Sequence, residues 1–308
     1  MRRSRASSFL GSLFALLLAT LAAGCAGTGE PEGTEESLQE VLQEERRGAI
    51  DVPAALGEVQ IAVDERRYVE ATQILARVLR ANPEEAEALY LLGEVNLARG
   101  QFANALNLFK RVEGEPGLRA RALQGIGISQ LRLEAMDEAY RALEAATTAD
   151  PSLVRAWNAL GIYHDSQGNW SKAEEAYGRA LELAPKDADV RNNRGYSLLA
   201  QGRFSEAERE FEQAIALDPE AAVARTNLRL TMAWQGRYRE AAFGLAAQER
   251  AAMLNNIGYI AMMRGDFAEA EAYLAQSMET SASFYEPASK NLELLEHMRA
   301  GAEAGATP

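Results

Sequence analysis

The feature that most constrains the fold of this chain is a repeat with a period of 34 residues. Alanine recurs in one phase of this period, at Ala71, Ala105, Ala139, Ala173, Ala207 and Ala241. Glycine recurs in another phase, at Gly93, Gly127, Gly161 and Gly195. A further unit follows a deletion of five residues, with Gly258 and Ala270 in the same relative places. Self-similarity at a fixed period of this length indicates an array of stacked units rather than independent domains.

The stretch 154–187 predicts two helices with a turn between them. Its apolar and small residues recur at intervals of three and four, which is typical of amphipathic helices. Gly168 lies in a polar segment between the two periodic runs, where it can adopt a positive φ. Pro185 follows the second run and cannot continue a helix. Because glycine in the phase of Gly161 recurs in four units and alanine in the phase of Ala173 in six, we expect these small residues where the two helices approach most closely.

The repeated block resembles the tetratricopeptide repeat, a helix–turn–helix unit of 34 residues. The residues that carry the resemblance are Trp157, Leu160, Gly161, Ala173, Tyr177, Ala180 and Pro185. The resemblance extends over roughly residues 52–284. It implies an all-α fold, namely a right-handed superhelical solenoid of about seven helix–turn–helix units with a C-terminal capping helix.

The expected repeat array spans residues 52–284, and its units are 52–85, 86–119, 120–153, 154–187, 188–221, 222–250 and 251–284. An N-terminal capping helix is expected at 38–51, a C-terminal capping helix at 285–300 and a disordered tail at 301–308. The unit 222–250 has Arg229 in the glycine phase and lacks the closing proline, so we expect irregular stacking there.

The first 24 residues have the pattern of an export signal. Three arginines precede an apolar run at 9–21, which is too short to span a membrane and leads into the sequence Leu-Ala-Ala-Gly-Cys ending at Cys25. This sequence is similar to the lipobox of bacterial lipoproteins, which implies removal of 1–24 and lipidation of Cys25. Residues 25–37 would then form a flexible tether. Since Ala26 follows the cysteine, the same resemblance favours the outer membrane, with the protein facing the periplasm. An ordinary signal peptide is the alternative.

The charge of the chain argues against nucleic acid as a partner. The formal net charge is −13, and no basic run offsets it. A surface of this sign also repels anionic lipid headgroups, so membrane contact is expected through the lipid anchor only.

Catalytic and metal-binding patterns are missing from the sequence. The two histidines, His164 and His297, lie far apart, and Cys25 is the only cysteine. The run His164-Asp165-Ser166 contains the residue types of a catalytic triad, but adjacent residues on one helix cannot adopt the triad geometry. We therefore expect a protein that is not an enzyme and that holds no cofactor and no metal.

The candidate binding surface consists of asparagines and tyrosines on the first helices of successive units. Its residues are Asn158, Asn192, Asn193, Tyr196, Asn227, Asn255, Asn256 and Tyr259. In the superhelix implied by the resemblance, this face lines the concave groove, where carboxamides could hold the backbone of an extended peptide or another part of a partner protein. The alternative is that the asparagines belong to the repeat pattern and serve the fold, and the sequence favours neither interpretation.

An exported repeat array without catalytic groups is interpreted as a scaffold that mediates protein–protein interactions. The segments 192–241, 254–279 and 283–295 resemble the tight-adherence (Flp) pilus assembly lipoproteins of the TadD type. Two alternatives remain: a pilotin-like lipoprotein that escorts a secretin, and an accessory activator of a cell-wall enzyme.

Overall fold

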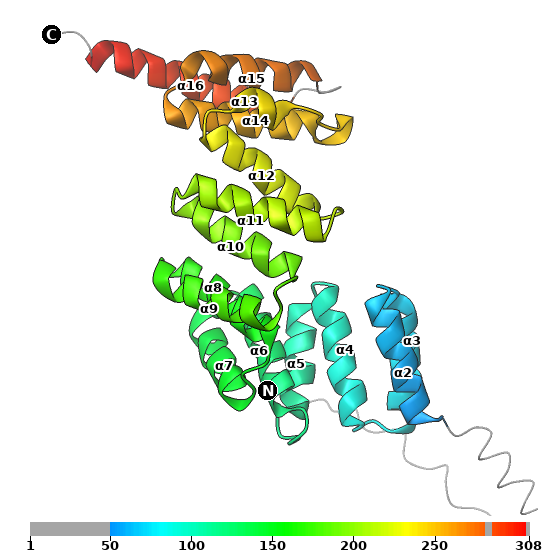
Figure 1. Cartoon of the computed structure of the whole chain (residues 1–308). Helices are drawn as coiled ribbons and strands as arrows, with labels where there is room; N and C mark the ends of the chain where they lie inside the picture. The colour runs from blue at the N-terminus through cyan, green and yellow to red at the C-terminus, as the bar shows by residue number, and fades with distance from the viewer. Residues whose placement is uncertain (1–49, 281–284, 306–308) are drawn as a thin grey trace, which may run out of the picture. The chain divides into compact units, whose positions relative to one another are not determined.

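The computed structural model describes residues 50–280 and 285–305 (Figure 1), and within these residues the chain forms fifteen helices and no strand. Seven helical pairs follow one another: α2 (Val52–Asp64) with α3 (Tyr68–Ala81), α4 (Ala86–Ala98) with α5 (Phe102–Val112), α6 (Arg119–Arg132) with α7 (Met136–Ala149), α8 (Val154–Ser166) with α9 (Trp170–Leu183), α10 (Ala188–Ala200) with α11 (Phe204–Leu217), α12 (Ala222–Trp234) with α13 (Tyr238–Ala242), and α14 (Ala247–Arg264) with α15 (Phe267–Thr280). A single helix, α16 (Glu286–Gly305), follows the last pair.

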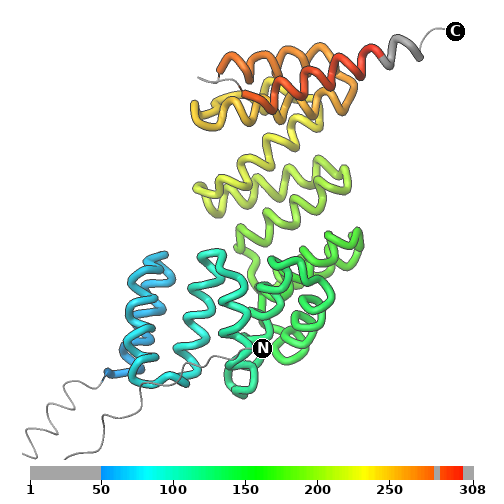
Figure 2. Tube along the Cα trace, turned by 180° about the vertical axis from the view of Figure 1, so that it is seen from behind, coloured from blue at the N-terminus to red at the C-terminus, as the bar shows by residue number. Residues whose placement is uncertain are grey.

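The helical pairs stack in the order of the sequence, as the continuous trace in Figure 2 shows. Each helix contacts the next one along the chain, and the first helices of neighbouring pairs also contact each other, from α2 with α4 to α12 with α14. Helix α16 packs on both α14 and α15. The fold is therefore an all-α solenoid, as predicted, in which each unit buries its apolar surface against its neighbours.

The repeated glycines lie where the two helices of a pair touch. A Cβ atom added to Gly195 would come within 2.7 Å of the Phe211 ring, and one added to Gly258 within 2.7 Å of Leu274. In the same way, Gly161 faces the ring of Tyr177. The alanines of the repeated phase, from Ala71 to Ala270, have no exposed surface. The prediction that these small residues mark the closest approach of the paired helices is confirmed.

The turn within each pair has a residue with positive φ at a constant place. Gly168 occupies it in the central unit with φ of 67°. Two units have other residues there, Arg66 with φ of 59° and Glu134 with φ of 61°. This conformation carries no steric cost for glycine but is unfavourable for residues with a Cβ atom.

The unit 222–250, which has Arg229 in the glycine phase, has a truncated second helix. Helix α13 has five residues, and α14 begins at Ala247, four residues earlier than the expected unit boundary. The Arg229 side chain lies beside this short helix and donates hydrogen bonds of 2.7 Å to the carbonyl oxygens of Ala241 and Phe243. Arginine is accommodated in the glycine phase because the second helix stops before it would cross this position.

The ends of the array differ in part from the predicted boundaries. Helix α16 extends to Gly305, so residues 301–305 are helical rather than a disordered tail. At the other end, Asp51 is the N-cap of α2, and its carboxylate accepts a hydrogen bond of 3.1 Å from the backbone nitrogen of Ala54. The predicted capping helix therefore does not reach residue 51. The signal peptide, Cys25, the tether and residues 38–49 lie outside the described residues.

Candidate protein-binding face

The asparagines of the candidate face bind one another between successive first helices. The Nδ2 of Asn193 on α10 donates to the Oδ1 of Asn158 on α8 across 3.1 Å. The Nδ2 of Asn227 on α12 donates to the Oδ1 of Asn192 across 3.0 Å, and Asn192 donates in turn to Asn193 across 3.3 Å. These three bonds form one continuous carboxamide network over α8, α10 and α12.

A second asparagine network lies at the C-terminal end of the array. Asn255 on α14 accepts a hydrogen bond of 2.9 Å from Asn291 on α16 and donates to Asn256 across 3.4 Å. In α12, which precedes this network, Thr226 occupies the position that Asn192 holds in α10. Without a carboxamide at that position, α12 has no acceptor equivalent to Asn192, and the bond pattern is interrupted beside the truncated unit.

Of the two interpretations that the sequence left open, the structure favours for most of the asparagines the one in which they serve the fold. Asn227 is 9% exposed and Asn255 is 8% exposed, and both form bonds to other asparagines. Asn256 is exposed, and the Nδ2 of Asn158 donates to no other group in the described residues. Most of these asparagines thus bond to one another, and Asn256 is the exposed one among them.

The side chains of the two tyrosines of the candidate face, Tyr196 and Tyr259, are exposed. The first-helix stripe is defined here as four residues that share one phase of the repeat, three residues after Asn193, Asn227 and Asn256 and at the equivalent place in α8: Ile162, Tyr196, Leu230 and Tyr259. Tyr196 is 57% exposed, Tyr259 41% and Ile162 38%, whereas Leu230 is partly buried. The asparagine network joins α8, α10 and α12, which carry Ile162, Tyr196 and Leu230, whereas α14, which carries Tyr259, contacts α12 outside this network.

Further toward the N-terminus, the equivalent surface is charged and internally paired. Arg155 on α8 forms an ion pair of 2.6 Å with Glu94 on α4, two units away. Arg121 on α6 pairs with Glu87 at 3.1 Å and lies 4.7 Å from the centre of the Tyr90 ring. Burial, and then the nearby Glu94 carboxylate, raise the pKa of Tyr90 above its usual range.

The sequence analysis did not predict this charged network, although the sequence contains an indication of one of its two ion pairs. Glu87 and Arg121 are separated by 34 residues, so opposite charges occupy one phase of neighbouring units. The ion pair between Glu94 and Arg155 has no such signal, because 61 residues separate them and they occupy different phases.

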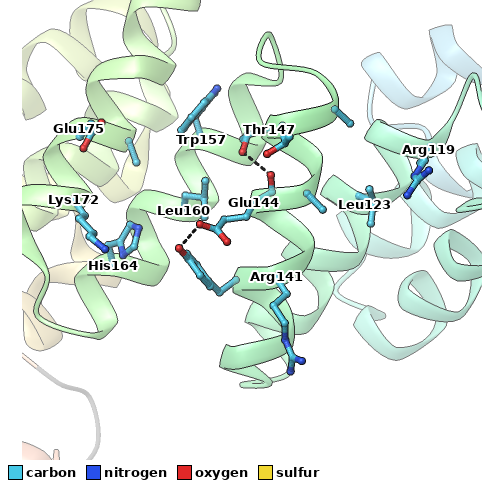
Figure 3. Close-up of a pocket in the computed structure, with 15 residues that line it drawn as sticks. Arg119, Leu123, Arg141, Glu144, Thr147, Trp157, Leu160, His164, Lys172 and Glu175 are labelled. Carbon is cyan, nitrogen blue, oxygen red and sulfur yellow. Dashed lines mark hydrogen bonds between the residues drawn. The ribbon is translucent and has the colours of Figure 1, made fainter.

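A separate cleft of about 910 Å³ lies between α7 and α9, with Leu160 and His164 of α8 in its lining (Figure 3). His164 is 9% exposed, and its Nδ1 has no hydrogen-bond partner in the structure. Burial, assisted by the charge of Lys172, lowers the pKa of His164, so the ring is neutral at pH 7. Arg119 lies at the opposite end of the cleft in Figure 3.

The neighbours of His164 do not form a catalytic triad. Asp165 accepts hydrogen bonds from the hydroxyls of Tyr177 at 2.8 Å and Ser197 at 2.6 Å, which links α8 to α9 and α10. Burial raises the pKa of Asp165. Ser166 donates to the carbonyl oxygen of Tyr163. Over residues 50–280 and 285–305, no cluster of three potential metal ligands occurs and no helix combines the length and hydropathy needed to cross a membrane.

Comparisons with known proteins give fragmentary similarity over the repeat array. Over 142 residues, the chain is 32% identical to the CTR9 homolog of Arabidopsis thaliana, a match that covers 44% of this chain and 13% of that protein. The chain therefore spans only a small part of this curated relative. Among solved structures, it resembles a thermophilic repeat protein of Thermus thermophilus, with a TM-score of 0.53 and 21% identity over 58% of this chain and 98% of that one.

A second solved structure, from the Cut9–Hcn1 hetero-tetramer of the APC/C, has a TM-score of 0.57 and 17% identity over 87% of this chain and 54% of that one. At these identities the structural likeness shows the fold alone. A family model described as "Cilia and flagella-associated protein 70 C-terminal domain", a tetratricopeptide-repeat family, matches residues 14–256, and a tetratricopeptide-repeat model matches residues 250–283. Because the first match covers well over half of the chain, the protein belongs to the tetratricopeptide-repeat family that this model describes.

Proposed function

We propose that this protein is a non-enzymatic scaffold that binds a partner protein on the face formed by the first-helix stripe. The observation that carries the proposal is the exposure of Ile162, Tyr196 and Tyr259 in one phase of the first helices α8, α10 and α14. Exposed aromatic and aliphatic side chains gathered on one surface are typical of protein interaction sites. The tetratricopeptide-repeat fold supports a role in protein–protein interaction.

The surroundings of the stripe strengthen the proposal. The asparagines beside it hold α8, α10 and α12 together, so Ile162, Tyr196 and Leu230 stand on helices that are bonded to one another. A rigid surface loses little conformational freedom on binding, which favours affinity. Tyrosine is also suited to binding, because it offers a large apolar area and a hydroxyl with few rotatable bonds.

The experiment is a capture of partners by the full chain, purified in detergent, with the captured proteins identified by mass spectrometry. The double variant Tyr196→Ala/Tyr259→Ala should lose the partner that the unchanged chain retains. Phe243→Ala is the matched control, because Phe243 is 82% exposed and lies outside the stripe. Undiminished capture by the double variant would contradict the proposal.

We also propose a cellular setting, which rests on the sequence pattern at the N-terminus. Cys25 would carry the lipid that anchors the protein to the outer membrane, with the repeat array facing the periplasm. By its resemblance to TadD-type lipoproteins, the scaffold would serve the assembly of a tight-adherence pilus. The alternatives, a pilotin for a secretin and an activator of a cell-wall enzyme, predict different captured proteins, so the same capture experiment distinguishes them.

A further inference from the structure

The spacing of the first-helix stripe restricts the shape of a bound segment. Each of α8, α10, α12 and α14 contributes one stripe residue, and each of these helices contacts the next first helix. Packed helices lie about 8–10 Å apart, so the stripe offers one apolar contact at roughly that interval. A partner segment that follows the stripe must present apolar side chains at the same interval.

Among regular peptide conformations, polyproline II matches this interval together with the available polar groups. Its rise of about 3.1 Å per residue and three residues per turn bring every third side chain to one side, about 9.3 Å apart. A β-strand presents side chains to one side at about 6.6–6.8 Å, which is too short. An α-helix can approach the interval with every seventh residue, but its backbone groups are already bonded to each other.

The polar atoms beside the stripe include hydrogen-bond donors. The Nδ2 of Asn158 is free among the described residues, and the hydroxyls of Tyr196 and Tyr259 stand on exposed rings. A polyproline II segment has no internal hydrogen bonds, and proline residues contribute carbonyl acceptors but no N–H donors. Donors on the protein therefore complement the backbone of a proline-rich segment.

The charge of the surface limits the charge of the segment. We consider three positions on each of α8, α10, α12 and α14: the stripe residue and the residues three and seven positions before it. At these positions only Arg155 and Asp189 are charged, and Arg155 is paired with Glu94. The Arg155–Glu94 pair also marks the N-terminal limit of the uncharged surface. Such a surface offers few ion pairs to a strongly charged segment, so it favours a weakly charged one.

We propose that the first-helix stripe binds a weakly charged, proline-rich segment of a partner in the polyproline II conformation, with an apolar side chain at every third residue. The proposal rests on the proposed function and adds the chemistry of the segment. The stripe residues would contact the apolar side chains, while Asn158, Tyr196 and Tyr259 would donate to backbone carbonyl groups.

The test uses fluorescence anisotropy with the full chain in detergent and three labelled synthetic peptides. The first repeats Leu-Pro-Gln five times, and the second has the same composition with leucine at every second residue over its first nine residues. The third is a proline-free amphipathic helix with the same number of leucines. The first peptide should bind at least about tenfold more tightly than the other two, a preference that Tyr196→Ala/Tyr259→Ala removes and Phe243→Ala retains.

Equal or tighter binding of the second or third peptide would overturn the inference, as would a preference that survives the tyrosine double variant. The result is separable from the proposed function. If the double variant loses its captured partner while the unchanged protein binds the three peptides equally, the proposed binding face is supported and the proposed polyproline II segment is contradicted. If neither the partner nor the peptide depends on the tyrosines, both proposals fail.

Discussion

The carboxamide of Asn193 on α10 binds that of Asn158 on α8 across 3.1 Å, so that two asparagines 35 residues apart join neighbouring units. Asn193 also accepts a hydrogen bond from Asn192, which itself accepts one from Asn227. The network uses the carboxamides of the first helices to join neighbouring units. The surface available to a partner is mainly the exposed first-helix stripe beside the network.

The first prediction concerns the stability that this network provides. Asn193→Ala removes a donor and an acceptor at once and should lower the free energy of unfolding by about 0.5–1.5 kcal/mol for each bond lost. Urea unfolding followed by circular dichroism measures the change. Asn256→Ala is the control, since Asn256 is exposed and accepts one long bond of 3.4 Å. Equal effects of the two substitutions would show that the network does not stabilise the array.

The second prediction compares two glycines of one helical pair. Gly161→Ala forces a Cβ atom against the ring of Tyr177 and should destabilise the protein by about 1–3 kcal/mol. Gly178→Ala lies in α9 with no atom near the added Cβ, and it should stabilise the helix by about 0.5–1 kcal/mol. Thermal unfolding of both variants gives the sign of each change. A neutral or stabilising Gly161→Ala substitution would contradict the close packing of α8 and α9.

These glycines illustrate what the sequence can predict. Glycine recurs in the phase of Gly161 at whole multiples of the period, so the sequence predicted its place at a close helix contact. Arg229 in the same phase predicted that the unit 222–250 is irregular. The sequence did not predict the hydrogen bonds between the asparagines, because a carboxamide can bind a ligand as well as it can bind another carboxamide. The distance between adjacent first helices decides between these uses, and it depends on tertiary packing. The ion pair between Arg155 and Glu94 also depends on tertiary packing, so the sequence did not predict it.

The third prediction concerns pH. Burial lowers the pKa of His164 in the folded protein, so below about pH 6.5, the ordinary pKa of histidine, the unfolded chain binds a proton that the folded chain does not. His164 by itself therefore lowers the free energy of unfolding as the pH decreases from 7 to 5, while Asp165, whose pKa is raised by burial, contributes in the opposite sense. His164→Phe removes this proton uptake, so its loss of stability over the same range should be smaller. His297→Phe, at an exposed position, is the matched control.

The difference is measured by urea unfolding at intervals between pH 7 and pH 5, and it cannot exceed about 1.4 kcal/mol per pH unit for one proton. Parallel pH curves for the unchanged protein and His164→Phe would show that His164 is not held neutral by the fold.

The fourth prediction concerns Cys25. If this residue carries the lipid anchor, Cys25→Ser should abolish labelling of the protein by a fatty-acid probe and release it from the membrane fraction or leave it unprocessed. Within the described residues, no helix is long and apolar enough to hold the protein in the membrane in place of the lipid. Unaltered processing and unaltered membrane partition of Cys25→Ser would exclude the lipid anchor.

The most direct measurement of the central claim is site-specific photo-crosslinking in cells that produce the full chain. A benzophenone amino acid is placed at Tyr196, within the first-helix stripe, or at Phe243, an exposed aromatic position outside it. If the stripe is the binding face, position 196 should yield a crosslinked partner protein on illumination and position 243 should yield none of that partner. Crosslinking of the partner at position 243 but not at position 196 would contradict the proposed binding face.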